Sequence, residues 1–268
     1  MKTIALTNGG LAYVDEGNGQ PVLLIHGFPL DHTMWAAQIA SLAEHARVFA
    51  PDLRGFGQSP LGAVDPQHGI SMAQYAEELA EFLSALEIAE PICIAGFSMG
   101  GYVAWQFVQR FKQRVRALIQ CDTRALADTA EGRAGRIKMA ENVAEWGSRR
   151  VAEMMGPKLF SARALETQPQ LMAEVRRVVE ETPAAAIAAA QRGMAARPDV
   201  TAMLPTIDMP TLVLVGEVDA ISPPAEMQAI ADAIPNSEFV VIPASGHMTT
   251  MESPRAVNDA ILDYLERI

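Results

Sequence analysis

Short runs of apolar residues alternate along the chain with segments whose apolar positions recur every three or four residues. This alternation of strand-like and helix-like patterns is typical of β-α-β units and predicts a mostly parallel sheet with helices on its faces. The fold class is therefore α/β. Seven runs are predicted as strands: residues 11–14, 22–25, 48–50, 92–95, 117–120, 212–215 and 239–242.

Helix start signals lie between these runs. Ser71 and Gln74 form a capping-box pattern before an amphipathic stretch, and Ser222 and Ser253 each precede a proline suited to a first helical turn. Residues 255–268 repeat apolar side chains at helical spacing, so this last segment is expected to pack one face on the sheet.

The alternation stops between residues 124 and 197, where no strand-like run occurs and the pattern is helical. We therefore predict a core domain formed by residues 1–123 and 198–268, and an inserted helical cap formed by residues 124–197. Breaks between the cap helices are expected at Gly147, Pro157, Pro169 and Pro183.

The charge balance limits the partners of the protein. The chain carries 21 Lys and Arg against 32 Asp and Glu, a formal net charge of −11. Such a surface repels phosphate backbones and anionic lipid headgroups, so neither nucleic acid nor a membrane is an expected partner. The predicted cap reverses the balance, with 12 Lys and Arg against 9 Asp and Glu. This difference is either ordinary variation between helix surfaces or a sign that the cap docks electrostatically or guides an anionic substrate.

The two cysteines, Cys93 and Cys121, each lie in an apolar run and are predicted as buried free thiols. A disulfide framework and a cysteine metal site are thus disfavoured, and we expect neither a metal nor a cofactor. The apolar stretch near the N-terminus is too short for a signal peptide, and no run reaches the roughly 18 residues of a membrane span. We expect a cytoplasmic protein with a small-molecule substrate, and leave its oligomeric state open.

The pentapeptide Gly-Phe-Ser-Met-Gly at residues 96–100 directly follows a predicted strand and opens a helical pattern. In that setting a sharp turn exposes the hydroxyl of Ser98 at the end of the strand. Glycine is needed at positions 96 and 100, because side chains there would collide with the neighbouring strand and helix. Ser98 is therefore the candidate nucleophile, and an ordinary loop serine is the alternative.

A serine hydroxyl needs a base within hydrogen-bond reach, and the base needs a third group to hold it. Among the five histidines, His247 is the candidate base, because the loop before it follows a predicted strand and places it at the carboxyl edge of the sheet. His26 also follows a strand, but its His-Gly-Phe-Pro context predicts a structural role in that loop. The other three are predicted at the surface or at helix ends: His32, His45 and His68.

Asp219 is the candidate third member, because it lies in the loop after the strand at residues 212–215. The chain order Ser98, Asp219, His247 is that of one known triad architecture. Asp122, just beyond another strand, and Glu217, two residues before Asp219, are the alternatives.

The oxyanion of an acyl-transfer intermediate needs buried donors, which backbone amides can supply. Met99 follows the nucleophile at the start of a helix. Phe28 lies in the loop after the strand at residues 22–25, and Pro29 beside it cannot donate. The amides of Phe28 and Met99 are therefore the predicted oxyanion hole.

Five motifs stand out along the chain: residues 26–29 (HGFP), 52–59 (DLRGFGQS), 96–101 (GFSMGG), 216–219 (GEVD) and 246–247 (GH). Taken together, they resemble the α/β-hydrolase superfamily, in the branch that holds 3-oxoadipate enol-lactonases and related esterases. The resemblance covers nearly the whole chain. It implies an eight-stranded, mostly parallel sheet flanked by helices, an inserted helical cap, and Ser98, Asp219 and His247 at the carboxyl edge of the sheet.

Departures from related families narrow the activity. Haloalkane dehalogenases and epoxide hydrolases of this fold use an aspartate nucleophile, whereas residue 98 is serine. Epoxide opening in that family also relies on tyrosines of the cap, and all four tyrosines here lie outside residues 124–197. Both activities are disfavoured, while carbon-carbon bond hydrolases and perhydrolases keep the same three residues and stay open.

The cap would supply the substrate pocket. Arg124 could hold a substrate carboxylate through a bidentate fork, or form a salt bridge with Asp122 or Asp128. Trp146 could line the pocket, as could Met154 and Met155, although such residues at helical spacing also form cores.

The sequence therefore favours a serine hydrolase that cleaves a small carboxylic ester or lactone through an acyl-enzyme on Ser98. A carbon-carbon bond hydrolase acting on a ring-cleavage dienoate is the second interpretation. The third interpretation is a ligand-sensing protein with the same fold, in which the triad hydrolyses its ligand slowly or only once.

Overall fold

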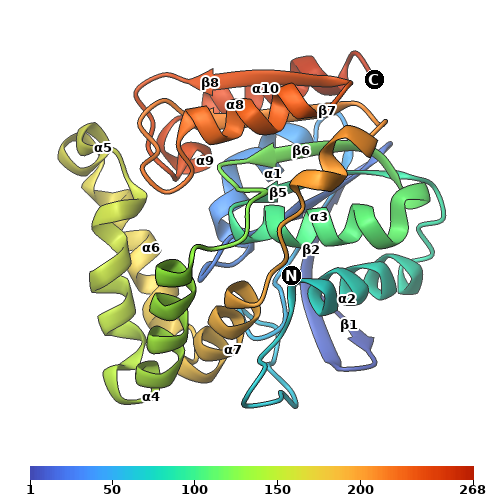
Figure 1. The fold of residues 1–268 in the computed structure, drawn as a ribbon. Coiled ribbons are helices and arrows are strands. Elements are labelled where there is room, and N and C mark those ends of the chain that lie inside the picture. Colours follow the sequence, from blue (N-terminus) through green and yellow to red (C-terminus); the bar gives the residue numbers. More distant parts are fainter.

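A computed structural model describes all 268 residues. The chain is built around one eight-stranded sheet (Figure 1). The strand order is β1-β2-β4-β3-β5-β6-β7-β8. β2 runs antiparallel to both of its neighbours, and all other neighbouring pairs are parallel. The strands are β1 (Lys2–Leu6), β2 (Gly9–Gly17), β3 (Pro21–Ile25), β4 (Arg47–Pro51), β5 (Ile92–Phe97), β6 (Val115–Cys121), β7 (Thr211–Gly216) and β8 (Ser237–Ile242).

The α/β class and the mostly parallel sheet predicted from the sequence are confirmed, and the seven predicted runs correspond to β2 through β8. The hydrophobic pattern missed β1. This strand lies at the edge of the sheet and most of its residues are exposed, so its short apolar run, residues 4–6, was considered only as part of a signal peptide.

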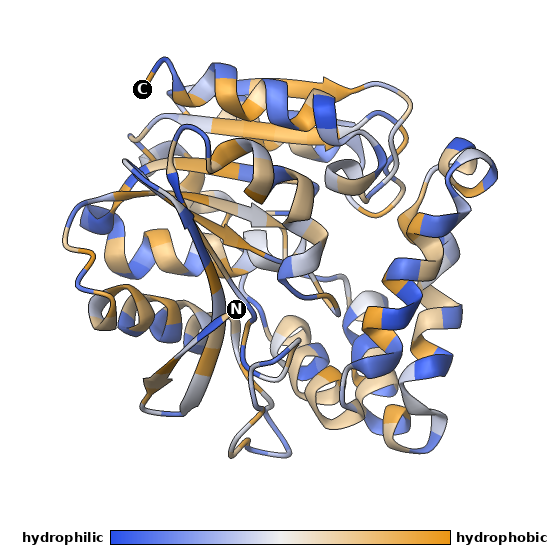
Figure 2. Ribbon diagram, turned by 180° about the vertical axis from the view of Figure 1, so that it is seen from behind, coloured by the Kyte–Doolittle hydropathy of each residue, from blue (hydrophilic) through white to orange (hydrophobic).

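Helices cover both faces of the sheet, which explains the unbroken apolar runs of its central strands. β3, β5 and β7 are buried at every position, and Figure 2 shows mainly hydrophobic colours on strands inside the sheet, in contrast to the strands beside the N-terminus. α2 packs against α3, and α1 packs against α10. The helices of this part are α1 (Ala36–Leu42), α2 (Met72–Ala85), α3 (Met99–Phe111), α8 (Pro224–Ala233), α9 (Thr249–Glu252) and α10 (Pro254–Leu265), with the 3-10 helices η1 (His32–Trp35), η2 (Lys112–Arg114) and η3 (Thr201–Thr206).

The predicted helix starts are found in the structure. Ser71 and Gln74 form a complete capping box at the start of α2. Prolines occupy the first positions of α8 and α10, where the missing N–H has no helical partner in any case. α10 presents Val257, Ile261 and Tyr264 as its buried side.

Four α-helices without an intervening strand lie between β6 and β7, before η3. Figure 1 shows these inserted helices on the side of the molecule towards which the arrows of β6 and β8 point. Three of the predicted breaks occur: Gly147 kinks α4 with a φ of 74°, Pro169 starts α6, and Pro183 caps α7. The inserted helices are α4 (Ala130–Leu159), α5 (Ala162–Thr167), α6 (Pro169–Glu181) and α7 (Ala184–Ala195).

The break expected at Pro157 is wrong, because this proline lies inside the last turn of α4 and the helix continues to Leu159. A proline removes one backbone donor, and so close to the end of a helix this costs a single hydrogen bond.

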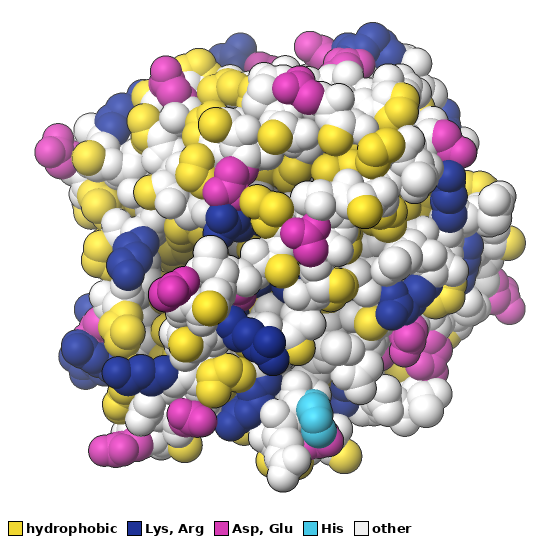
Figure 3. All heavy atoms as spheres, viewed as in Figure 1, with side chains coloured by type: hydrophobic (Ala, Val, Ile, Leu, Met, Phe, Trp, Pro, Cys, Tyr) yellow, Lys and Arg dark blue, Asp and Glu magenta, His cyan; other side chains and the backbone are white.

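Figure 3 shows basic side chains over the inserted helices. Several of them form ion pairs one turn apart, such as Arg176 with Glu180 at 2.7 Å and Arg177 with Glu181 at 2.8 Å. None of the helices combines the length and the apolar character that crossing a membrane requires.

Both cysteines are free and buried, as predicted. Burial raises the pKa of the Cys93 thiol to about 12. A thiol that stays protonated at neutral pH is a poor nucleophile, so Cys93 is a packing residue and no rival to Ser98.

Candidate active site

Ser98 occupies the turn that joins β5 directly to α3. Its backbone has φ 51° and ψ −112°, a conformation that residues with a side chain rarely adopt. Such strain is kept only where the surrounding structure enforces it, and it is concentrated at functional sites. The turn leaves Ser98 half-buried, whereas both neighbours, Phe97 and Met99, are buried.

Close backbone contacts at Gly96 and Gly100, the two glycines of the motif, enforce this conformation of Ser98. A Cβ atom on Gly96 would lie 2.6 Å from the carbonyl oxygen of Gly100. A Cβ atom on Gly100 would lie 2.1 Å from the carbonyl oxygen of Ile25 in β3. Only glycine fits at either position, and the turn is therefore fixed against the sheet.

Three side chains from distant parts of the chain meet beside this turn. The Oγ atom of Ser98 lies 3.0 Å from Nε2 of His247, and Nδ1 of the same ring lies 2.8 Å from Oδ2 of Asp219. The side chains of His247 and Asp219 are almost fully buried, with 2% and 0% exposed. A base thus contacts the hydroxyl on one side and a carboxylate on the other, the arrangement that nucleophilic catalysis by serine requires.

The orientation of the Asp219 carboxylate is fixed by its second oxygen. Oδ1 accepts hydrogen bonds from the backbone N–H groups of Ile221 at 2.7 Å and Ser222 at 3.0 Å. Oδ2 is therefore left to face His247, and the acceptor on Nδ1 favours the ring form with a free lone pair on Nε2.

The two amides predicted as an oxyanion hole have no competing backbone acceptor. Phe28 lies in the loop after β3, and its N–H donates no hydrogen bond to another backbone group. Met99 is the first residue of α3, so its N–H has no acceptor within the helix. The positive end of the α3 dipole adds to the attraction of Met99 for an anion.

The family model that matches residues 20–254 is the alpha/beta hydrolase fold. The chain belongs to this family. A solved thermophilic esterase from Thermogutta terrifontis, with malate bound, is 43% identical with a TM-score of 0.95, over 100% of this chain and 99% of the esterase. The enol-lactonase from Burkholderia xenovorans LB400 is 26% identical with a TM-score of 0.89, over 99% and 100% of the two chains.

A third similar protein is 2-hydroxy-6-oxo-6-(2'-aminophenyl)hexa-2,4-dienoic acid hydrolase from Metapseudomonas resinovorans. It is 26% identical to this α/β hydrolase, over 95% of this chain and 87% of the relative. The resemblance to the superfamily, and to esterases and enol-lactonases within it, is thereby confirmed.

The two alternative acids lie elsewhere in the hydrogen-bond network. The exposed Glu217 accepts a hydrogen bond from the N–H of Ala244 at 2.8 Å and does not contact the histidine. Asp122 is fully buried close to the site, but its carboxyl is bonded to Gly216 and Thr249. Of the three acids, only Asp219 is hydrogen-bonded to His247.

The predicted roles of Arg124 need correction. Its guanidinium forms a bidentate ion pair with Glu226, with both hydrogen bonds at 2.7 Å. The predicted partners are engaged elsewhere: Asp128 pairs with Arg136 and Arg197, and Asp122 is hydrogen-bonded as described above. The fork that was to hold a substrate carboxylate is therefore already occupied by Glu226.

The candidate pocket residues of α4 differ in exposure. Trp146 is half-buried directly before the kink at Gly147, and its role in a pocket stays a prediction. Met155 packs against the hydrophobic core, whereas Met154 is 38% exposed.

Two further histidines organise the loop that carries Phe28. His26 is fully buried, and its Nε2 accepts a hydrogen bond from the N–H of Leu53 at 2.9 Å, which fits its predicted structural role. His32 is half-buried and is the first residue of η1, which fits the helix-end position predicted for it, and its Nδ1 lies 2.7 Å from Oδ1 of Asp52.

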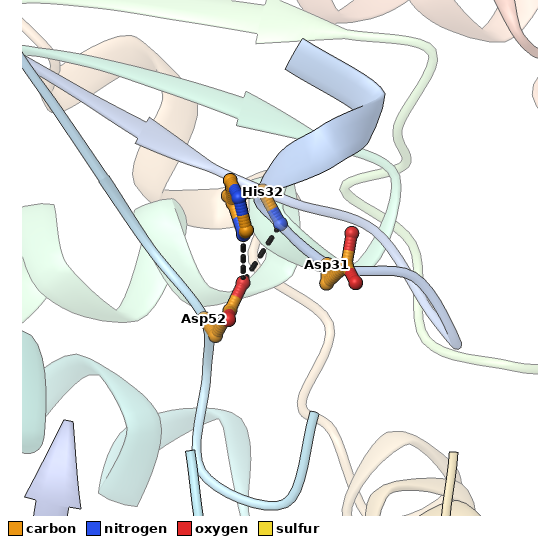
Figure 4. A group of neighbouring side chains, drawn as sticks. All are labelled: Asp31, His32 and Asp52. Carbon is orange, nitrogen blue, oxygen red and sulfur yellow. Dashed lines mark hydrogen bonds and ion pairs between the residues drawn. The ribbon is translucent and has the colours of Figure 1, made fainter. Parts of the chain in front are cut away.

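Figure 4 shows that the ring and the backbone N–H of His32 converge on the same oxygen of Asp52. The other oxygen of Asp52 accepts from the N–H of Gln58, while Asp31 accepts from the N–H and hydroxyl of Thr33. Both carboxylates thus accept hydrogen bonds from nearby protein groups. We therefore interpret the cluster as a structural hydrogen-bond network and not as a metal site.

Because His32 is paired with Asp52, we expect the free energy of unfolding to depend on pH. Burial lowers the pKa of His32, but the hydrogen bond and charge of Asp52 outweigh burial and raise this pKa above its ordinary value of 6.5. The charge contribution of His32 is therefore complete below that value and is lost as the pH rises through the raised pKa. We expect His32→Ala to lower the free energy of unfolding by about 3 kcal/mol in mildly acidic buffer, and by less in alkaline buffer.

Urea unfolding of both proteins across this pH range measures the difference. The matched control is His68→Ala, because His68 forms a similar pair with Asp65 but is exposed. A cost for His32→Ala that grows with rising pH would contradict the assigned charge of the pair.

No motif or spacing pointed to Glu252, although this buried carboxylate joins the histidine loop to the inserted helices. It accepts hydrogen bonds from the N–H of Gly246 at 3.1 Å, and from the N–H of Ser161 at 3.2 Å and its hydroxyl at 2.5 Å. Met248, on the other side of the histidine, donates to the carbonyl of Leu159 at 3.0 Å.

We expect Glu252→Gln to lower the free energy of unfolding by about 2 kcal/mol, because an amide NH₂ would then face N–H and O–H donors in a buried site. Urea unfolding measures the loss. Glu266→Gln, at an exposed position on the last turn of the chain, is the control. Equal stability of the two variants would show that the carboxylate does not hold these segments together.

Proposed function

We propose that this α/β hydrolase cleaves a small carboxylic ester or lactone through an acyl-enzyme on Ser98. The observation that carries the proposal is the pair of contacts on His247, with the Ser98 hydroxyl at 3.0 Å and the Asp219 carboxylate at 2.8 Å. The solved esterase and enol-lactonase named above support this substrate class over other reactions of the fold.

In the first half of the proposed reaction, Nε2 of His247 takes the proton of Ser98 as Oγ bonds to the substrate carbonyl carbon. The carbonyl oxygen becomes an oxyanion, which the N–H groups of Phe28 and Met99 stabilise. The bond from carbon to the alcohol oxygen then breaks, and His247 gives its proton to that oxygen. Asp219 holds the ring and stabilises its positive charge throughout.

In the second half, His247 takes a proton from water as the water oxygen attacks the acyl carbon. The bond to Ser98 breaks, the serine recovers its proton and the carboxylic acid leaves. A lactone follows the same steps, except that the alcohol and the acid remain joined in the product.

The experiment that tests this proposal is reaction with a fluorophosphonate, followed by mass spectrometry of the intact protein and of its peptides. We expect one phosphonyl group per chain, attached to Ser98, and parallel loss of p-nitrophenyl acetate hydrolysis. A protein that neither turns over esters nor reacts at Ser98 would contradict the proposal. An acetyl group that forms once and is not released would instead support a ligand sensor.

Hydrolysis of a carbon-carbon bond in a dienoate is the second candidate, favoured by the similarity to the dienoic acid hydrolase. A panel that contains short p-nitrophenyl esters, lactones and a ring-cleavage dienoate separates the two. A dienoate turned over with a higher kcat/KM than every ester and lactone would decide for the second candidate.

A further inference from the structure

Asp122 is a fully buried carboxyl group to which the proposed reaction gives no role. It follows the last residue of β6, and its backbone takes a φ of 48°, in the left-handed region. Its N–H donates to the carbonyl of Leu214 at 2.9 Å, and its carbonyl accepts from the hydroxyl of Ser222 at 3.0 Å. These two hydrogen bonds fix the position of the Asp122 backbone.

The side chain of Asp122 connects the two loops that carry the other members of the site. Oδ1 accepts a hydrogen bond from the N–H of Gly216 at 2.9 Å, three residues before Asp219. Oδ2 is hydrogen-bonded to the hydroxyl of Thr249, two residues after His247. One carboxyl group therefore sets the spacing between the acid loop and the histidine loop.

The surroundings of Asp122 contain no cation to balance a negative charge. No Lys or Arg lies within ion-pair distance of it, whereas single ligand atoms of Asp122, Asp219 and His247 all lie within 4.8 Å of one another. Two buried carboxyl groups this close cannot both be ionised at low cost. Asp219 has His247 and two N–H donors to stabilise its charge, so the proton belongs on Asp122.

We propose that Asp122 is a positioning residue which works as a neutral acid, accepting from Gly216 and donating to Thr249, and thereby holds Asp219 and His247 at hydrogen-bond distance. The inference rests on the proposed function of the same site. Burial, followed by the charge of Asp219, raises the pKa of Asp122 well above its usual range, which agrees with this geometry. The structure records this bond with the Thr249 hydroxyl as the donor, and protonation of Oδ2 reverses it, because a hydroxyl oxygen can accept as well as donate.

Two substitutions at Asp122 distinguish a neutral acid from a charged one. Asparagine copies the neutral acid, because its carbonyl accepts from Gly216 and its NH₂ donates to Thr249. We expect Asp122→Asn to keep kcat/KM for p-nitrophenyl acetate within about threefold of the parent protein, since the bridge is preserved. Asp122→Ala removes the bridge, and we expect kcat to fall about 10²-fold, as a small misplacement of reacting groups can cause. KM should change little, because Asp122 contacts no substrate in the proposed reaction.

Infrared spectroscopy provides a readout that does not depend on turnover. The parent protein at neutral pH should show a carboxylic acid carbonyl band that is absent from Asp122→Asn. The control variant, Asp232→Asn, lies at an exposed position on α8 and should retain the band.

Two results would overturn the proposal. One is an Asp122→Asn protein that unfolds at the same temperature as the parent yet is as slow as Asp122→Ala. The other is an infrared difference spectrum without the carboxylic acid band. If Asp122→Ala does not fold, the asparagine variant and the band decide alone. Should the parent protein lack both ester hydrolysis and reaction at Ser98, the proposed function fails, while the infrared test of Asp122 still gives its answer.

Discussion

Replacing Ser98 by alanine is expected to lower kcat for short p-nitrophenyl esters by about 10⁶-fold, the loss found when a serine nucleophile is removed. Without Oγ no acyl-enzyme forms, and water would have to attack directly. In the proposed mechanism the backbone donors at Phe28 and Met99 would still polarise the carbonyl, so a small residual rate above the uncatalysed reaction is expected. Initial rates with p-nitrophenyl acetate measure the loss, and the same variant should not react with a fluorophosphonate.

The control for this prediction is Ser84→Ala. Ser84 is a serine of α2 whose hydroxyl donates to the carbonyl of Ala80, remote from His247 in the sequence and in its contacts. This variant should keep the activity of the parent protein. Ester hydrolysis by Ser98→Ala at more than a few per cent of the parent rate would require another nucleophile and would exclude the proposed mechanism.

Residues at the ends of strands were the most predictable part of the site. Ser98, Asp219 and His247 each follow a run that is recognisable from its apolar residues, and parallel strands bring their carboxyl ends to one edge. Local sequence therefore sufficed to select three side chains that the structure places within 3.0 Å of their partners. The substitutions of Ser98 and Asp219 test the chemical roles of these side chains.

Contacts between polar residues far apart in the sequence were not predictable in the same way. Ser161 and Glu252 are 91 residues apart, and Arg124 and Glu226 are 102 residues apart. Ser161, Glu226 and Glu252 lie in a helix or at its start, and Arg124 lies in the loop after β6. Charged and hydroxyl side chains at such positions normally face solvent. Only the packing of distant segments in the folded chain selects the partner, and no periodicity in the sequence carries that information.

The structure shows which carboxylates pair with the basic residues of the inserted helices. Arg136 and Arg197 both pair with Asp128, and the pairs at one-turn spacing on α6 engage two more arginines. Local ion pairs thus account for much of the positive charge that the sequence showed. The interpretation of ordinary helix-surface variation gains support from these pairs.

Replacing Asp219 by asparagine is expected to lower kcat for p-nitrophenyl acetate by about 10⁴-fold. The carboxylate now accepts from Nδ1 of His247 while its other oxygen is held by two N–H groups. In the variant the amide oxygen is expected to keep those two donors, so the NH₂ group would point at the ring. That donor favours the ring form with its proton on Nε2, which cannot take a proton from Ser98. Single-turnover acetylation, followed by the release of p-nitrophenolate, measures the loss in the step that needs the base.

The double variant Asp219→Asn, Asp122→Asn decides whether the second buried acid can replace the first. In Asp219→Asn, the carboxyl of Asp122 loses its negatively charged neighbour and ionises more readily. Its oxygens are nevertheless bonded to Gly216 and Thr249, and no hydrogen bond joins it to His247. We therefore expect the double variant to acetylate as slowly as Asp219→Asn and no slower. A single variant that loses much less than 10⁴-fold, combined with a double variant that loses the full amount, would mean that Asp122 turns towards His247 and acts as the acid of the triad.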